Sequence, residues 1–261
     1  MINLEEKAGI EVALDDNNKL SFGPEVDVEN ISIRKNSDLL PVLMNKNLEL
    51  SDEPAYTMYR NVKRVSDSEK IANSGLRFDL TVMPPQKFGD EFVKTVGHSH
   101  PVKPGTSTGY PEIYSVISGT ATFIFQKMED GLATDIIISQ VSEGGTIVIP
   151  PGYGHVTVNE SDKTLVMANW LSDNFQANYS EFEKLGGAAY YIVEKFGNIE
   201  QEKNPSYGDL PARKELKPNP MIINKTLGES AYSYVNSLSS LDFLNNPEKY
   251  TDELIVENLF E

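Results

Sequence analysis

The most informative stretch of the sequence reads "GHSHPVKPGTSTGYPEIYSVISG", residues 97–119. It contains His98 and His100, two of only three histidines among 261 residues, and Glu112 follows after a gap of eleven residues. In a β-strand, residues i and i+2 face the same side of the sheet, so a strand here would direct both imidazoles toward one point. A single histidine is usually a hydrogen-bonded core residue, but two at this spacing favour a metal site.

The third histidine lies in a second strand-forming segment. His155 belongs to "GGTIVIPPGYGHVTVN", residues 144–159, where it follows a Pro-Gly turn and precedes β-branched residues. All three histidines therefore occupy the ends of predicted strands, where side chains from different strands meet. This placement favours one site shared by the three imidazoles.

Strand-like segments fill the middle of the chain. Residues 54–204 alternate short β-rich runs with Gly- or Pro-containing turns, a pattern typical of an antiparallel barrel or sandwich. The segment "EFVKTVGHSH", residues 91–100, is one of these predicted strands. Ser118-Gly119 predicts a hairpin turn, and "EDGLAT", residues 129–134, predicts a second turn between strands. A short helix is expected to end at Gly186-Gly187.

The two ends of the chain have a different character. Residues 1–53 predict short strands and a loop that pack on the barrel. Residues 205–261 predict a Pro-rich loop and then a helical extension, which Asn246-Pro247 breaks into two pieces. The chain is therefore expected to consist of a central barrel, residues 54–204, with an addition at each end.

The charge balance excludes several classes of partner. The chain has 23 Lys and Arg against 39 Asp and Glu, a net charge of −16, so nucleic acid and anionic membrane surfaces are not expected partners. It has no apolar run of about 18 residues and no signal-like N-terminus. The absence of cysteine fits a cytoplasmic location. A small phosphorylated ligand is still compatible, because backbone N–H groups and hydroxyls can hold a phosphate.

The two histidine-containing segments resemble the paired motifs of the cupin superfamily. The second motif, G-x5-P-x-G-x2-H-x3-N, is complete from Gly144 to Asn159. The first motif departs from the pattern only in its longer gap between the second histidine and the glutamate. This longer gap predicts a loop at the mouth of the barrel, beside the site formed by the histidines. The resemblance implies a mainly β double-stranded β-helix, or jelly-roll barrel, with one divalent metal ion. Its implied ligands are His98, His100, Glu112 and His155, a set that suits Fe2+ or Mn2+, with Zn2+ and Ni2+ as alternatives.

Further segments resemble the cupin-type phosphoglucose isomerases, a family first known from archaea. "EPAYTMYR" at residues 53–60 and "FDLTVMPP" at residues 78–85 extend this similarity upstream of the first motif. The resemblance implies interconversion of glucose 6-phosphate and fructose 6-phosphate, a step of glycolysis and gluconeogenesis, and a homodimer. The residues implied to bind the sugar and its phosphate are Tyr56, Thr81, Thr95, Gly97 and Tyr179. Glu112 and Tyr114 are implied to act beside the sugar carbons.

The sequence leaves alternatives open for both the mechanism and the class of function. Glu112 would move a proton between C1 and C2 through a cis-enediol, or the metal would mediate a hydride shift. The family carries a further histidine after the last metal-ligand strand, and "MANWLSDNFQANYS", residues 167–180, has none. A cupin dioxygenase that uses iron and O2 is the alternative enzyme. A non-enzymatic sugar-binding cupin is disfavoured, because all four metal-ligand residues are present.

Overall fold

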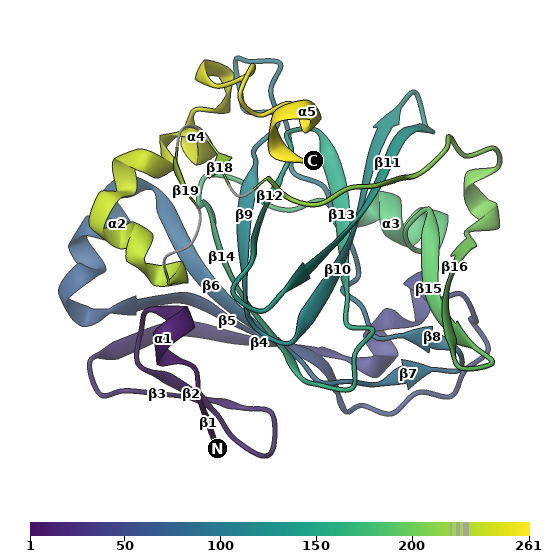
Figure 1. Ribbon diagram of the computed structural model, residues 1–261, viewed down its shortest axis with the longest axis horizontal. Coiled ribbons are helices and arrows are strands. Elements are labelled where there is room, and N and C mark those ends of the chain that lie inside the picture. The colour runs from purple at the N-terminus through teal and green to yellow at the C-terminus, as the bar shows by residue number, and fades with distance from the viewer. Residues whose placement is uncertain (220, 223–224, 227–229) are drawn as a thin grey trace.

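Two β-sheets of mainly antiparallel strands face each other in the computed structural model, which describes residues 1–219, 221–222, 225–226 and 230–261 (Figure 1). The larger sheet has the order β12-β9-β14-β6-β5-β4, with bounds Thr146–Ile149, Glu112–Ser118, Leu165–Ser172, Leu76–Met83, Pro54–Arg64 and Val26–Lys35. The smaller sheet has the order β13-β10-β11-β17, with bounds Tyr153–Val158, Thr120–Glu129, Leu132–Ser142 and Lys214–Glu215. The predicted mainly β jelly-roll barrel is confirmed.

The core lies between these sheets because their strands are apolar on the inner face. Every residue of β13 and β14 is buried. In β10 the rings of Phe123 and Phe125 are both fully buried, with centroids 5.9 Å apart. Trp170 of β14, the only tryptophan, is 1% exposed and lies on the opposite face of the larger sheet, where its ring packs against Phe78 and Tyr232.

One of the two predicted turns joins the expected strands, and the other does not. Glu129 pairs with Leu132 across the Asp130-Gly131 turn, so β10 and β11 form the expected hairpin. The chain also turns at Gly119, where φ is +84°. However, β9 and β10 enter different sheets, so the predicted hairpin is wrong. Gly119 packs closely on the backbone of Thr164, 3.1 Å from where a Cβ would stand, and so forms a corner of the barrel.

The strand predicted over residues 91–100 is only partly formed. Glu91–Phe92 is the short strand β8, in a third sheet with β7 (Lys87–Phe88), β15 (Tyr190–Lys195) and β16 (Asn198–Lys203). After β8, isolated bridges pair Lys94 with Val158 and His98 with His155. Gly97, with φ +87°, interrupts regular pairing because that conformation lies outside the β region.

Several short strands and helices lie outside the two main sheets. The N-terminal strands β1, β2 and β3 form a small sheet of their own, with α1 between β1 and β2; the bounds are Ile2–Asn3, Val12–Leu14, Leu20–Phe22 and Glu5–Ala8. A 3₁₀ segment, Asn36–Val42, follows β4, and a second, Val65–Asp67, leads into α2, Ser68–Ser74. Helix α3, Ser180–Leu185, ends at Gly186 in the left-handed conformation, as predicted.

The C-terminal extension is helical, as predicted, and packs against the larger sheet beside α2 (Figure 1). Its pieces are the 3₁₀ segments Pro205–Tyr207, Ala231–Leu241 and Pro247–Lys249 and the helices α4 (Asp242–Asn245) and α5 (Val256–Leu259). The strands β18 and β19, Met221–Ile222 and Lys225–Thr226, lie between Pro205–Tyr207 and the later helical pieces. The indole N–H of Trp170 donates to the carbonyl of Ala231 at 2.9 Å, which ties the extension to β14.

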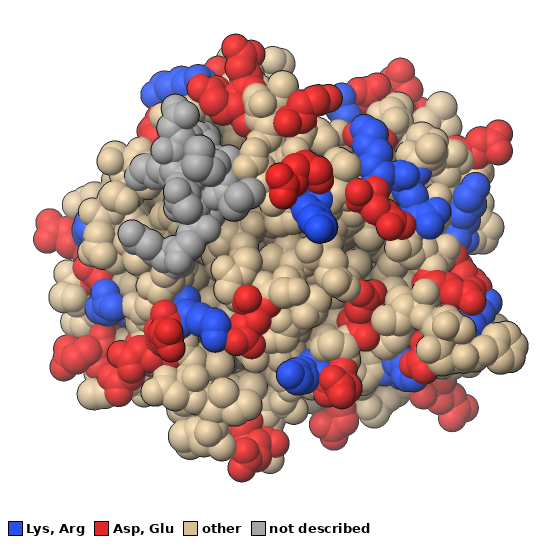
Figure 2. All heavy atoms as spheres, viewed as in Figure 1, with Lys and Arg blue, Asp and Glu red and all other residues tan. Residues whose placement is uncertain are grey.

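The described surface is mixed in charge. On the face shown in Figure 2, basic side chains stand singly or in small groups next to acidic ones. Within the described ranges, no helix is both long and apolar enough to cross a membrane.

Candidate active site

The three histidines and Glu112 meet at one point between the two sheets. Glu112 is the first residue of β9, His155 lies on β13, and His98 is bridged to His155. One ligand atom from each of the four residues lies within 4.8 Å of all the others. Glu112 Oε2 is 3.3 Å from His100 Nε2 and 3.6 Å from His155 Nε2. The structure thus brings together all four residues that the sequence implicates in metal binding.

The chemistry of these atoms fits a divalent cation. In the described part of the chain, Glu112 Oε2, His100 Nε2 and His155 Nε2 are buried atoms without a hydrogen-bond partner. Leaving buried polar atoms unpaired is costly, and a metal ion would satisfy all three. Desolvation, followed by the neighbouring imidazoles, lowers the pKa of His98 and His155 well below its usual value. Their rings are therefore neutral and keep lone pairs for a metal.

Two hydrogen bonds orient side chains of the cluster. The carbonyl of Tyr110 lies 2.9 Å from His100 Nδ1 and can only accept, so Nδ1 carries the proton and the lone pair of Nε2 is free to bind a cation. The amide of Asn169, on β14, donates to Glu112 Oε1 at 2.6 Å. That bond leaves Glu112 Oε2 facing the histidines.

The eleven-residue insert between His100 and Glu112 lies beside the cluster, as expected from its length. Tyr110, near its end, stacks on Phe175 at 4.8 Å, and Phe175 in turn lies 4.5 Å from the ring of His100. At the other side of the insert, Lys103 bonds to Glu248 at 2.8 Å. The insert therefore connects a histidine of the cluster to the C-terminal extension.

A cavity of about 470 Å³ opens next to the cluster. Its mouth is bordered by exposed residues of β4 and of the loop after β14, including Glu29, Asp173 and Gln176. His155 is 1% exposed and lies behind the cavity wall. The cavity is lined by every residue that the resemblance assigns to the substrate, together with three of the four cluster residues: Tyr56, Thr81, Thr95, Gly97, Tyr114, Tyr179, His98, His100 and Glu112.

Two of the three tyrosines that line the cavity, Tyr56 and Tyr114, have a raised pKa and are protonated at neutral pH. Burial, and then the charge of Glu112, raises the pKa of Tyr114 well above its usual value. Burial also raises the pKa of Tyr56. The hydroxyl of Tyr56 accepts from the backbone N–H of Val96 at 3.4 Å.

Gly97 has a packing role that sequence reasoning left open against close approach of a ligand. A Cβ at this position would lie 2.5 Å from Val156 Cγ2 and 2.6 Å from Phe182 Cδ1. Real Cβ atoms do not come so close, so the glycine is required by the side chains behind it and by its positive φ.

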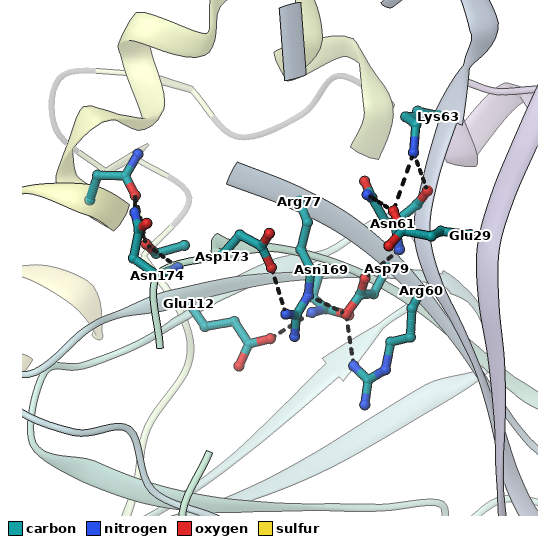
Figure 3. Close-up of polar contacts among 12 residues, drawn as sticks. Glu29, Arg60, Asn61, Lys63, Arg77, Asp79, Glu112, Asn169, Asp173 and Asn174 are labelled. Atoms are coloured by element: carbon teal, nitrogen blue, oxygen red, sulfur yellow. Dashed lines mark hydrogen bonds and ion pairs between the residues drawn. The ribbon is translucent and has the colours of Figure 1, made fainter. Parts of the chain in front are cut away.

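Sequence reasoning missed a charged group in the cavity wall. Arg60 and Arg77 line the cavity, and both guanidinium groups donate to the fully buried carboxylate of Asp79, as Figure 3 shows. Arg34 is a further cation close to the site, 5.7 Å from the ring centroid of Tyr179. The sequence could have indicated part of this group, because Arg77, Asp79 and Thr81 alternate along one predicted strand and so share a face.

Comparisons with known proteins find a matching family model, similar sequences and similar solved structures. The family model described as Glucose-6-phosphate isomerase (GPI) matches residues 33–208. A glucose-6-phosphate isomerase of Thermococcus litoralis is 28% identical over 202 residues, which cover 72% of this chain and 97% of that protein. One from Sinorhizobium medicae is 28% identical over 165 residues, covering 60% and 73%. Among solved structures, a recombinant oxalate oxidase in complex with glycolate has a TM-score of 0.36 at 19% identity, covering 47% of this chain and 54% of that chain.

Proposed function

This chain belongs to the glucose-6-phosphate isomerase family, and we propose that it interconverts glucose 6-phosphate and fructose 6-phosphate. The observation that carries the proposal is the convergence of three imidazoles and one carboxylate beside a cavity of sugar-phosphate size. Family membership favours this isomerase over the dioxygenase and the sugar-binding protein that the sequence left as alternatives.

The proposed cofactor is one divalent metal ion, Fe2+ or Mn2+. When bound, such an ion polarises the substrate carbonyl as a Lewis acid. Support comes from the unpaired buried atoms that converge on one point. The proposed ligands are His98, His100, Glu112 and His155.

The substrate phosphate is proposed to bind at the end of the cavity formed by hydroxyls and backbone. Thr81 and Thr95 supply hydroxyls there, and Gly97 supplies backbone. Tyr56 and Tyr179 lie alongside, and Arg34 sits next to both tyrosines. Arg34 thus adds a positive charge where a chain of net charge −16 would otherwise repel a phosphate.

Glu112 and Tyr114 are proposed to act at the sugar carbons. The raised pKa of Tyr114 keeps its hydroxyl protonated, so it serves as a hydrogen-bond donor. Glu112 is the proposed proton carrier between C1 and C2. Solvent deuterium in the product would support this route, and its complete absence would support a hydride shift.

The test of the function is an assay of the purified, manganese- or iron-loaded protein with fructose 6-phosphate. We expect glucose 6-phosphate to form without oxygen consumption. Absence of turnover with both metals, together with oxygen uptake on other organic substrates, would favour the dioxygenase and contradict the proposal.

We further propose that the protein is cytoplasmic, as the absence of cysteine suggests.

We also propose that two copies of the chain pair through β4. In the described chain β4 is the outer strand of the larger sheet, and its Ile31 and Ile33 are 55% and 56% exposed. Long edge strands with exposed apolar residues favour pairing with another chain. Light scattering should give a dimer mass, and Ile31→Lys should give a monomer. A monomeric wild-type protein at micromolar concentration would contradict the pairing.

A further inference from the structure

A row of polar side chains crosses the cavity wall from β9 to β5. In the strand register, Asn169 of β14 is opposite Tyr114 of β9 on one side and Asp79 of β6 on the other. On β5, the next strand, Arg60 completes the row with a 2.7 Å bond from Nη1 to Asp79 Oδ2. Figure 3 shows Asn169, Asp79 and Arg60 along this line, with Arg77 pointing toward the same carboxylate.

Asp79 fixes both guanidinium groups. Its Oδ2 also accepts from Arg77 Nε at 3.1 Å, and its Oδ1 accepts from the backbone N–H of Asn61 at 2.8 Å. Arg77 Nη1 bonds to Asp173 at 3.0 Å, and Arg60 Nη2 contacts the sulfur of Met58. These contacts engage two nitrogens of each guanidinium. Because a guanidinium has five N–H donors and both side chains are about one-quarter exposed, donors are left for the cavity.

The register places this row between the two proposed ends of the substrate. Inward-facing residues of one strand follow each other at about 6.7 Å, so Thr81 and Arg77 of β6 are about 13 Å apart with Asp79 between them. Arg77 lies in the row of Glu112, because Leu171 is opposite both. This step rests on the proposed function, in which phosphate binds near Thr81 and C1 and C2 lie near Glu112. The middle carbons of the sugar then lie over the Asp79 row.

We propose that Arg60 and Arg77 are specificity-determining residues that donate hydrogen bonds to the hydroxyl oxygens at C3, C4 and C5 of the open-chain sugar. A guanidinium only donates, so it selects ligands that present oxygen acceptors at these carbons. A ligand without those hydroxyls leaves desolvated N–H groups unpaired, which enzymes use to reject analogues.

The surrounding charges favour hydroxyls over a second phosphate as the bound group. Asp79 and Asp173 each pair with Arg77, and Asp79 pairs with Arg60 as well. The two arginines and two aspartates therefore balance. A balanced cluster with spare donors suits neutral oxygen atoms, whereas a second dianionic group needs an excess of positive charge.

The experiment compares two phosphate ligands by calorimetry on the full-length, manganese-loaded protein. Glucitol 6-phosphate is acyclic and presents all the hydroxyls without a reactive carbonyl, and glycerol 3-phosphate reaches only the phosphate end. In Arg60→Met and Arg77→Met we expect glucitol 6-phosphate to bind about tenfold more weakly, or worse, and glycerol 3-phosphate to bind as in the wild type. Each variant leaves the buried carboxylate of Asp79 one arginine and the Asn61 N–H as partners.

Control variants make the outcomes distinct. Lys63 lies on the same strand as Arg60 and pairs with Asp27 and Glu29, but it is not among the cavity-lining residues, so Lys63→Met should bind both ligands normally. If Arg60→Met does not fold, Arg60→Lys keeps a cation beside Asp79 and should show the same selective loss.

Three results would overturn the inference. Unchanged binding of glucitol 6-phosphate in both arginine variants would make the cluster purely structural. An equal loss of affinity for both ligands would indicate that the arginines bind the phosphate. A wild-type protein that binds glycerol 3-phosphate but gains nothing from the longer ligand would show that the middle hydroxyls are not contacted. By contrast, a wild-type protein that binds neither ligand would contradict the proposed function itself, and the inference with it.

Discussion

At the cluster, the carboxylate of Glu112 depends on Asn169, a residue of the neighbouring strand β14. Asn169 holds Oε1, and only Oε2 is left for the histidines. We expect Asn169→Leu to weaken manganese binding by about tenfold to a hundredfold, the usual cost of losing a group that orients a metal ligand. Manganese titration of the metal-free protein measures it. Asn204→Leu, which removes another buried amide far from the cluster, is the matched control; equal affinity in wild type and Asn169→Leu would contradict the positioning role.

The neutral state of His155 predicts a pH dependence of stability. Burial lowers its pKa in the folded protein, whereas the unfolded chain has the usual value of about 6.5. Below about pH 6.5 the unfolded state therefore binds a proton that the folded state does not, so lowering the pH favours unfolding. The metal-free protein should lose up to about 1.4 kcal/mol per pH unit from this group.

Urea unfolding between pH 7 and pH 5 measures this effect. His155→Gln has no imidazole to titrate, so the stability difference between the wild type and this variant should change as the pH falls. A constant difference across the range would contradict the assignment of a neutral, proton-excluding His155.

The candidate site was predictable in part because its ligands are rare residues at fixed spacings. His98, His100 and His155 are the only histidines in the chain, so the position of each one helped to predict the site. Arg60 and Arg77 were not recognised, because they are ordinary residues on separate strands. Arg77 shares β6 with Asp79, but only the pairing of β5 with β6, which a single sequence does not specify, brings Arg60 to Asp79.

Among the structural elements, the segment that carries His98 is set by one glycine. Gly97→Ala would combine a positive φ with contacts under 3 Å to Val156 and Phe182. We expect a loss of about 2–4 kcal/mol in the free energy of unfolding, from strain and overpacking together. Gly105→Ala is the control, since Gly105 has φ +80° with nothing within 4 Å, and should cost about 1–2 kcal/mol. Equal losses in both variants would contradict the packing role.

Turn signals predicted chain reversal better than strand pairing. The Asp130-Gly131 turn joins paired strands, whereas Gly119 connects two sheets. Both glycines satisfy the same local requirement for positive φ. The surroundings differ, because Gly119 packs against the backbone of Thr164, whereas nothing lies within 4 Å of a Cβ built at Gly131. Such a tertiary contact leaves no mark in the sequence of the turn itself.

For the whole molecule, we expect the residues after the family match to unfold together with the barrel. Phe260 is 5% exposed and packs on Phe125 of β10, with ring centroids 5.6 Å apart. We expect Phe260→Ala to destabilise the protein by about 3–5 kcal/mol. Phe196→Ala, at a fully exposed position, should change stability by less than about 0.5 kcal/mol.

The same variants show whether the barrel and the extension unfold together. Trp170 is the single tryptophan and bonds to Ala231 of the extension, so its fluorescence reports on their contact. Its urea transition should coincide with the loss of circular dichroism in wild type and Phe260→Ala alike. Two separate transitions would show that residues 205–261 form an independent unit.

Manganese-dependent turnover of fructose 6-phosphate, measured on one metal-free preparation during stepwise addition of the ion, tests the central claim most directly. The three histidines and Glu112 predict one manganese bound per chain, activity that rises in proportion to occupancy, and loss of both in His155→Ala. Full activity before any metal is added, or full activity in folded His155→Ala, would contradict a metal-dependent isomerase centred on these four residues.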